Sequence, residues 1–169
     1  MRRTFMIALS SVVIVAGLAL ASLQAAAQAP AEKKTGTLIL RGDMTYFFGP
    51  GKPKNCNLSN VYKHGEPVGW RIEAVDPQTG QHVEPEAQLV VHLNYAGKTQ
   101  DIPMRWRATA QQPERQFWVA KWMVPADAPT GIVRFTVTAK DKYGRTGEFK
   151  PFDVEASQLT IVGDGPSSN

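Results

Sequence analysis

Cysteine, histidine and methionine are the residues of this sequence with the widest chemical scope. The chain has one cysteine, Cys56, with His64 eight positions later and the thioethers of Met44, Met104 and Met123 elsewhere. Thiolate, imidazole and thioether are the soft ligands of copper sites, and the same groups bind haem iron. These residues therefore predict, as one alternative, a metal- or redox-handling site for copper or haem at Cys56, His64 and Met44.

The spacing of these ligands departs from known metal-binding motifs. The chain contains no C-x-x-C or H-x-H pair, no C-x-x-C-H haem attachment, and no compact Cys, His and Met loop near its C-terminus. Met104 and Met123 fall in expected strands, where methionine usually fills the core. The first interpretation is therefore a protein without a cofactor.

Cys56 has two possible roles if it binds no metal. An unpaired cysteine in an oxidising compartment is either buried and inert or kept for a partner. One expectation places its thiol under the surrounding loop, against Val61 and Tyr62. The other keeps it for an intermolecular bond, and Lys52 and Lys54 would then stabilise the thiolate.

The sequence lacks the common catalytic motifs. The three histidines, His64, His82 and His92, lie in no G-x-S-x-G or H-E-x-x-H pattern. Gly49-Pro50-Gly51 lacks the following Lys-Ser/Thr and helix of a phosphate-binding loop. We therefore expect a protein that is not an enzyme.

One expected strand, from Gln116 to Val124, is apolar on both faces. Its core face would carry Trp118, Ala120 and Trp122, and its second face carries Phe117, Val119, Lys121 and Met123. Such a strand either packs against other elements on both faces or presents an exposed apolar patch on one of them. Arg105 and Arg107 lie in the preceding strand candidate, and arginine is enriched at interfaces. We predict that Phe117, Val119, Lys121, Met123, Arg105 and Arg107 form an interaction surface.

The tryptophans allow a further alternative, a carbohydrate-binding module that stacks sugars on exposed rings. The favoured interpretation is that Trp70, Trp118 and Trp122 fill the core instead.

The first 27 residues have the three parts of a secretory signal: basic Arg2-Arg3, an apolar stretch, and small residues at Ala25 and Ala27. The alternative is an uncleaved anchor, since residues 5–23 carry no charge. Cleavage leaves 17 basic and 15 acidic residues, so the net charge falls from +4 to +2. Nucleic acid is therefore not expected as a partner, and a membrane only if the segment stays uncleaved. A periplasmic or secreted location is expected.

Turn residues divide the remaining sequence into short strands. The chain has 14 Gly and 12 Pro, and most of them separate runs of alternating apolar residues. Among these runs, 101–107 and 147–155 each read as one strand. We predict an all-β chain with a 28–36 lead-in, one antiparallel β-sandwich of seven to nine strands over 37–163, and a disordered tail at 164–169.

Two stretches resemble bacterial immunoglobulin-like domains. The corner Pro125-Ala126-Asp127-Ala128-Pro129-Thr130-Gly131 leads into a strand that ends Ala139-Lys140-Asp141-Lys142-Tyr143-Gly144, and Asp76-Pro77-Gln78-Thr79-Gly80 is similar to the turn after their middle strand. The resemblance covers roughly residues 60–155 and implies an Ig-like or fibronectin-III-like sandwich, without the paired cysteines of antibody domains. Such modules serve many functions.

A non-catalytic, exported Ig-like module that docks on another envelope protein is the function we expect. It would present a sheet face or the 49–64 loop to its partner. The copper or haem site and the carbohydrate module stay as alternatives.

Overall fold

The computed structural model describes residues 34–83, 85–109 and 112–163. The expected signal segment 1–27 and the expected tail 164–169 lie outside these residues, as does most of the 28–36 lead-in. Within the described ranges, no helix has the length and apolar character needed to cross a bilayer.

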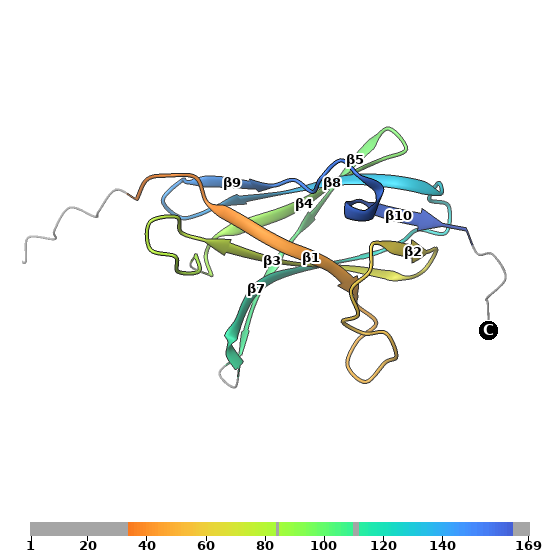
Figure 1. The fold of residues 1–169 in the computed structure, drawn as a ribbon, viewed down its shortest axis with the longest axis horizontal. Helices are drawn as coiled ribbons and strands as arrows, with labels where there is room; N and C mark the ends of the chain where they lie inside the picture. The colour runs from red at the N-terminus through yellow and green to blue at the C-terminus, as the bar shows by residue number, and fades with distance from the viewer. Residues whose placement is uncertain (1–33, 84, 110–111, 164–169) are drawn as a thin grey trace, which may run out of the picture. The chain divides into compact units, whose positions relative to one another are not determined.

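The described residues form two mostly antiparallel sheets, which confirms the all-β sandwich (Figure 1). The four-stranded sheet has the order β1 (Ile39–Tyr46), β3 (Pro67–Val75), β7 (Gln112–Met123), β6 (Arg105–Thr109). The six-stranded sheet has the order β2 (Val61–Lys63), β10 (Leu159–Val162), β8 (Gly131–Lys140), β4 (Gln88–Tyr95), β5 (Lys98–Pro103), and β9 (Thr146–Phe149) also pairs with β8.

The core lies between the two sheets and is built by alternation along the strands. On β3 the buried side chains are Val68, Trp70, Ile72 and Ala74; on β4 they are Leu89, Val91 and Leu93; on β8 they are Val133, Phe135, Val137 and Ala139. These are the residues that period-2 alternation places inward, because successive side chains of a strand point to opposite faces. Trp118, Ala120 and Trp122 of β7 complete the core as expected.

The run 101–107 does not form the single strand we predicted. It divides at Met104, so that β5 pairs with β4 in one sheet and β6 pairs with β7 in the other. The Met104 amide donates to the carbonyl of Leu89 at 2.8 Å, which holds the crossing point against β4. Uninterrupted alternation in the sequence cannot reveal such a crossing, because both halves keep an apolar face toward the same core.

The prediction of one strand over 147–155 is also wrong beyond Phe149. After β9 the chain leaves the sheet, passes through a short 3-10 helix η1 (Glu155–Ser157), and rejoins it as β10. Together with the division at Met104 and the three-residue strand β2, this brings the described strands to ten.

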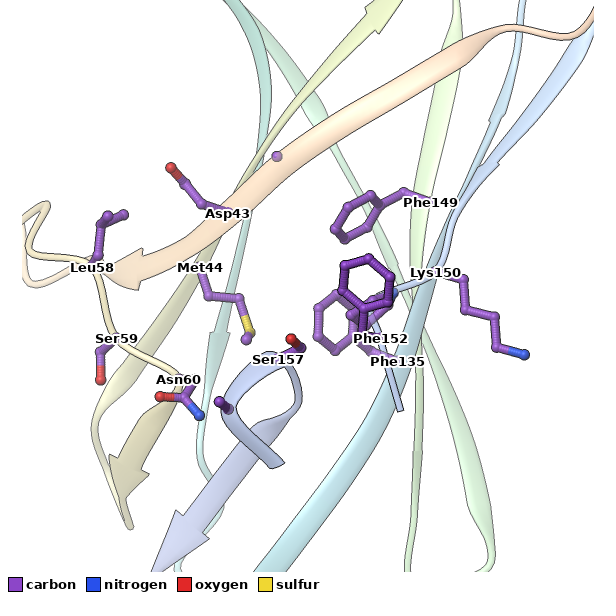
Figure 2. A pocket seen from close by; sticks show the side chains of 13 residues that line it. Asp43, Met44, Leu58, Ser59, Asn60, Phe135, Phe149, Lys150, Phe152 and Ser157 are labelled. Carbon is purple, nitrogen blue, oxygen red and sulfur yellow. The ribbon is translucent and has the colours of Figure 1, made fainter. Parts of the chain in front are cut away.

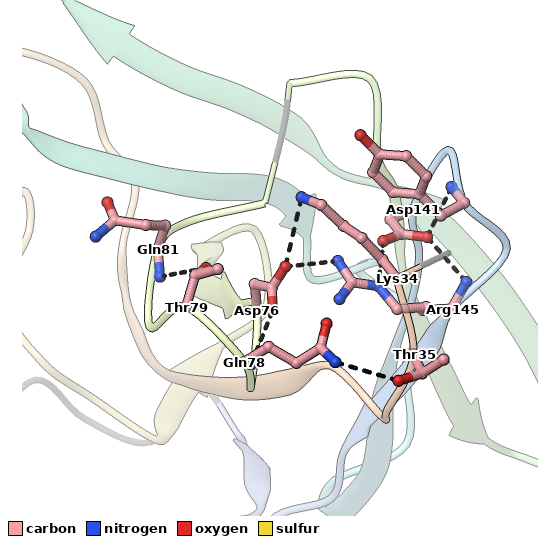
Figure 3. Close-up of polar contacts among 9 residues, drawn as sticks. Lys34, Thr35, Asp76, Gln78, Thr79, Gln81, Asp141 and Arg145 are labelled. Atoms are coloured by element: carbon pink, nitrogen blue, oxygen red, sulfur yellow. Dashed lines mark hydrogen bonds and ion pairs between the residues drawn. The ribbon is translucent and has the colours of Figure 1, made fainter. Parts of the chain in front are cut away.

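Two turns at one end of the sandwich are joined by a buried ion-pair cluster (Figure 3). Asp76 follows β3 of the four-stranded sheet, whereas Asp141 and Arg145 lie in the turn between β8 and β9 of the other sheet. Arg145 Nε donates to Asp141 Oδ2 at 2.7 Å, and Arg145 Nη2 lies 3.0 Å from Asp76 Oδ2. Hydrogen bonds from Arg145 lower the pKa of Asp76 to about 2 and help to lower that of Asp141 against the effect of its burial.

Candidate functional site

The outer face of the four-stranded sheet carries all six residues predicted as an interaction surface. One row across the sheet reads Asp43, Arg71, Val119 and Arg105 in register. Phe117, Lys121, Met123 and Arg107 share the parity of Val119 and Arg105 along β7 and β6. Phe117 and Val119 are half-buried and Met123 is 49% exposed, so this face of β7 is open to solvent in the described structure.

The loop after β1, residues 47–57, extends beyond the end of that strand (Figure 1). Phe47 packs on Gly69, where a Cβ atom would come within 2.3 Å of the Phe47 ring. Backbone hydrogen bonds close the loop at its base: the Tyr46 amide donates to Asn57, and the Cys56 amide donates to Tyr46. Glycine at position 69 therefore leaves room for the Phe47 ring at the start of the loop.

A cleft of about 290 Å³ separates this loop from β6 and β7. The loop contributes Phe47, Gly49, Pro50, Asn55 and Cys56, and the strands contribute Arg105, Arg107, Val119, Ala120 and Lys121. The structure thus brings Cys56 together with residues predicted as an interaction surface, although the two features lie about fifty or more residues apart in the sequence.

Cys56 is exposed, so the expectation that it lies buried against Val61 and Tyr62 is wrong. Its φ of 65° is left-handed, a conformation that side chains other than glycine adopt at an energetic cost. The base of the loop imposes that conformation, because the Cys56 amide is held by Tyr46 at 2.8 Å. Cys56 lines the cleft together with residues of β6 and β7.

Some charged side chains on this face have an ion-pair partner, and others have none among the described residues. Both described carboxylates are engaged: Asp43 accepts two hydrogen bonds from Arg71, at 2.7 and 2.6 Å, and Glu73 pairs with Arg41. The bond to Asp43 raises the pKa of Arg71 above its ordinary value. The other basic side chains that the structure describes on this face are Arg105, Arg107 and Lys121, and none of these has a carboxylate partner among the described residues. The face therefore carries an excess of positive charge beside the cleft.

The three candidate metal ligands occupy different parts of the fold. Met44 belongs to the inner face of β1, opposite to the face on which Cys56 lies. His64 lies in the turn before β3, where its Nε2 is 2.8 Å from the carbonyl of Ala128. Across the described ranges, no three His, Cys, Asp or Glu side chains gather in a way that could hold a metal ion. The structure does not bring Cys56, His64 and Met44 into one site.

The tryptophans are mostly enclosed. Trp70, Trp118 and Trp122 are buried in the core, and Trp106 is half-buried with its ring 5.4 Å from that of Trp118. Stacking on a sugar requires an open ring face, which the first three lack.

The structure also shows a polar cluster that the sequence analysis missed. On the outer face of the six-stranded sheet, His92 Nδ1 lies 2.7 Å from Asp101 Oδ1, and His92 Nε2 lies 2.8 Å from Thr138 Oγ1. A hydroxyl, an imidazole and a carboxylate in this order resemble a general-base arrangement. They come from three neighbouring strands, and Thr138 and His92 line different surface hollows. This geometry suits a cross-strand ladder that stabilises the sheet. Alternation placed His92 outward, but strand pairing alone decides which residues it meets.

Comparison with known proteins assigns no relationship to this chain: no protein-family model matches it, and no curated protein is significantly similar to it.

Proposed function

We propose that this protein is an exported, non-catalytic Ig-like module that docks on an acidic surface of another envelope protein. The docking face is the outer face of the four-stranded sheet, together with the cleft beneath the 47–57 loop. Export is supported by the basic, apolar and small-residue segments of residues 1–27.

The strand order supports the Ig-like part of the proposal. The Ig strands A to F correspond, in chain order, to β1, β3, β4, β6, β7 and β8. Strand G corresponds to β9 and β10 together, because both pair with β8. The four-stranded sheet then reads A-B-E-D, and the other sheet contains C-F-G, which is the arrangement of immunoglobulin constant-type domains.

The docking function rests on three exposed cations that have no carboxylate partner among the described residues and that surround an apolar part of the cleft. Val119 and Phe47 supply apolar contact in the cleft, and Arg105, Arg107 and Lys121 surround it. Charge complementarity then favours a partner segment rich in Asp or Glu, because like charges would repel and neutral surfaces would leave these cations unpaired. The chain as a whole is close to neutral without residues 1–27, so the positive face is a local property.

Binding of a dye-labelled oligoglutamate peptide, followed by fluorescence anisotropy, tests this proposal. The wild-type protein should bind the peptide, and added salt should weaken the binding because exposed charges are screened. Arg105→Glu combined with Arg107→Glu should weaken it about tenfold or more, since attraction becomes repulsion. The peptide should also slow the reaction of Cys56 with N-ethylmaleimide, because Cys56 lines the same cleft.

Lys98→Glu combined with Lys140→Glu is the matched control. Both lysines are exposed on the six-stranded sheet. The two substitutions lower the net charge by the same amount as Arg105→Glu combined with Arg107→Glu, but they leave the docking face unchanged, so peptide binding should fall only slightly. Equal losses in the two double variants would show that net charge, and not this face, binds the peptide. Absence of binding to the wild type would overturn the proposal.

A further inference from the structure

A larger cavity opens on the inner side of β1, between the edges of the two sheets. Its volume is about 620 Å³, which falls in the range of small-molecule pockets. Met44 of β1, Phe135 of β8 and Phe149 of β9 form much of its wall (Figure 2). Met44 and Phe135 are also core residues, so the cavity extends the core to the surface.

The cavity exists because the last strand is interrupted. Val137 pairs with Phe149 and Val133 pairs with Leu159 along the same edge of β8. The segment 150–158 is therefore much longer than the part of β8 that it passes, residues 134–136. The surplus chain bends away from the sheet instead of closing the gap between the sheets.

Two large apolar side chains stand exposed beside the opening. Phe152, in the surplus segment, is 81% exposed, and Leu58, in the loop before β2, is 67% exposed. Both line the cavity, although they come from distant parts of the sequence. Single exposed apolar residues are ordinary, but two at the mouth of an apolar cavity are typical of a ligand site.

The interior of the cavity is uncharged. Among the described residues that line the cavity, Asp43 and Lys150 are the charged ones. The Asp43 carboxylate is bound by Arg71 on the outer face, and the Lys150 side chain extends away from the cavity (Figure 2). The other polar lining side chains, Ser59, Asn60 and Ser157, are neutral. Burying an ionic ligand here would leave its charge without a counter-charge.

We propose that this cavity binds a neutral, aromatic small molecule. Three phenyl rings, of Phe135, Phe149 and Phe152, together with the Met44 sulfur favour an aromatic guest, because ring–ring and sulfur–ring contacts add to the hydrophobic contribution. The site is separate from the docking face, which lies on the other side of β1 and attracts anions.

The neutral fluorophore N-phenyl-1-naphthylamine tests the proposal with the intact chain. Its emission should rise on binding to the wild type. Phe152→Ser should weaken binding about tenfold, since the loss of one phenyl contact corresponds to roughly the 1.4 kcal/mol of a tenfold change. Phe152 is mostly exposed, so this variant keeps the fold, which an unchanged tryptophan emission spectrum would verify.

Val154→Ser is the matched control, because Val154 is exposed on the same segment but does not line the cavity. It should leave binding unchanged, and so should Arg105→Glu combined with Arg107→Glu, which removes the docking face only. The anionic fluorophore 1-anilinonaphthalene-8-sulfonate should bind the cavity more weakly than the neutral one. No emission rise, or equal losses with Phe152→Ser and Val154→Ser, would overturn the inference whatever becomes of the docking function.

Discussion

Arg145 is a buried cation that serves two carboxylates at once. Its guanidinium, 4% exposed, contacts Asp141 through Nε and Asp76 through Nη2. The two aspartates also hold their own turns, since Asp76 accepts the Gln78 amide and Asp141 accepts the amides of Tyr143 and Arg145. The aspartates of the two turn motifs are therefore both turn residues and counter-ions.

Arg145→Met should lower the free energy of unfolding by about 3–5 kcal/mol, because it leaves the buried Asp141 without its counter-charge and leaves Asp76 with only the 3.5 Å ion pair to Lys34. Urea unfolding at pH 7, followed by tryptophan fluorescence, measures the change. The control is Arg134→Met: Arg134 pairs with Asp153 in the solvent, with both side chains more than half exposed, and its loss should cost at most about 1 kcal/mol. Equal effects of the two substitutions would contradict a structural role for the buried cluster.

At the scale of elements, the 47–57 loop depends on a strand residue that has no side chain. Gly69 lies on the outer face of β3 beneath the Phe47 ring, and the Phe47 amide donates to Pro67 at 3.1 Å. A strand glycine usually marks a bulge or a close approach of another segment. Here it marks the place where the loop rests on the sheet and forms one wall of the cleft.

Gly69→Ala should displace the loop, since the new methyl group would overlap the Phe47 ring. We expect a loss of about 1–3 kcal/mol in unfolding free energy and faster reaction of Cys56 with N-ethylmaleimide. Gly163→Ala provides the comparison, because its Cβ would meet nothing closer than Thr130 at 3.9 Å. Unchanged Cys56 reactivity in Gly69→Ala would show that the loop is held by other contacts.

At the scale of the whole molecule, the Arg145 cluster ties the two sheets together at one end. Asp76 directly follows β3 of the four-stranded sheet, and Asp141 directly follows β8 of the six-stranded sheet. Protonation of either carboxylate weakens this link, so the stability of the sandwich depends on the same groups that hold its turns.

Stability should therefore fall in acid. The pKa of Asp76 is lowered to about 2 from its ordinary 3.8, and that of Asp141 is lowered as well. A carboxyl with a lowered folded-state pKa contributes its stability above the unfolded value and loses it as the pH falls toward the folded value. For Asp76 this contribution is about 2 kcal/mol. Urea unfolding between pH 5 and 2 should show the decline, and Asp76→Asn should reduce it; identical pH curves for the two proteins would contradict this origin.

Local pattern was enough to determine which side chains of most strands face the core. Val119 and Arg105 could be assigned to a non-core face, and Trp70 to the core, because the two-residue period of a strand is a property of neighbouring residues. The aspartates of the two turns could be placed in the same way, since Pro and Gly fix turn geometry locally.

Tertiary structure alone decided which distant segments these strand faces contact. Whether β6 continues β5 in one sheet or crosses to the other at Met104 depends on pairing with strands far along the chain. The position of Cys56 beside Arg105, and the cavity left by the interrupted edge of β8, depend on the same long-range pairing. The sequence therefore determined a β-sandwich with one surplus apolar strand face, whereas only the packing of distant segments made a cationic cleft and an apolar cavity, because both are enclosed by residues that are not neighbours in the chain.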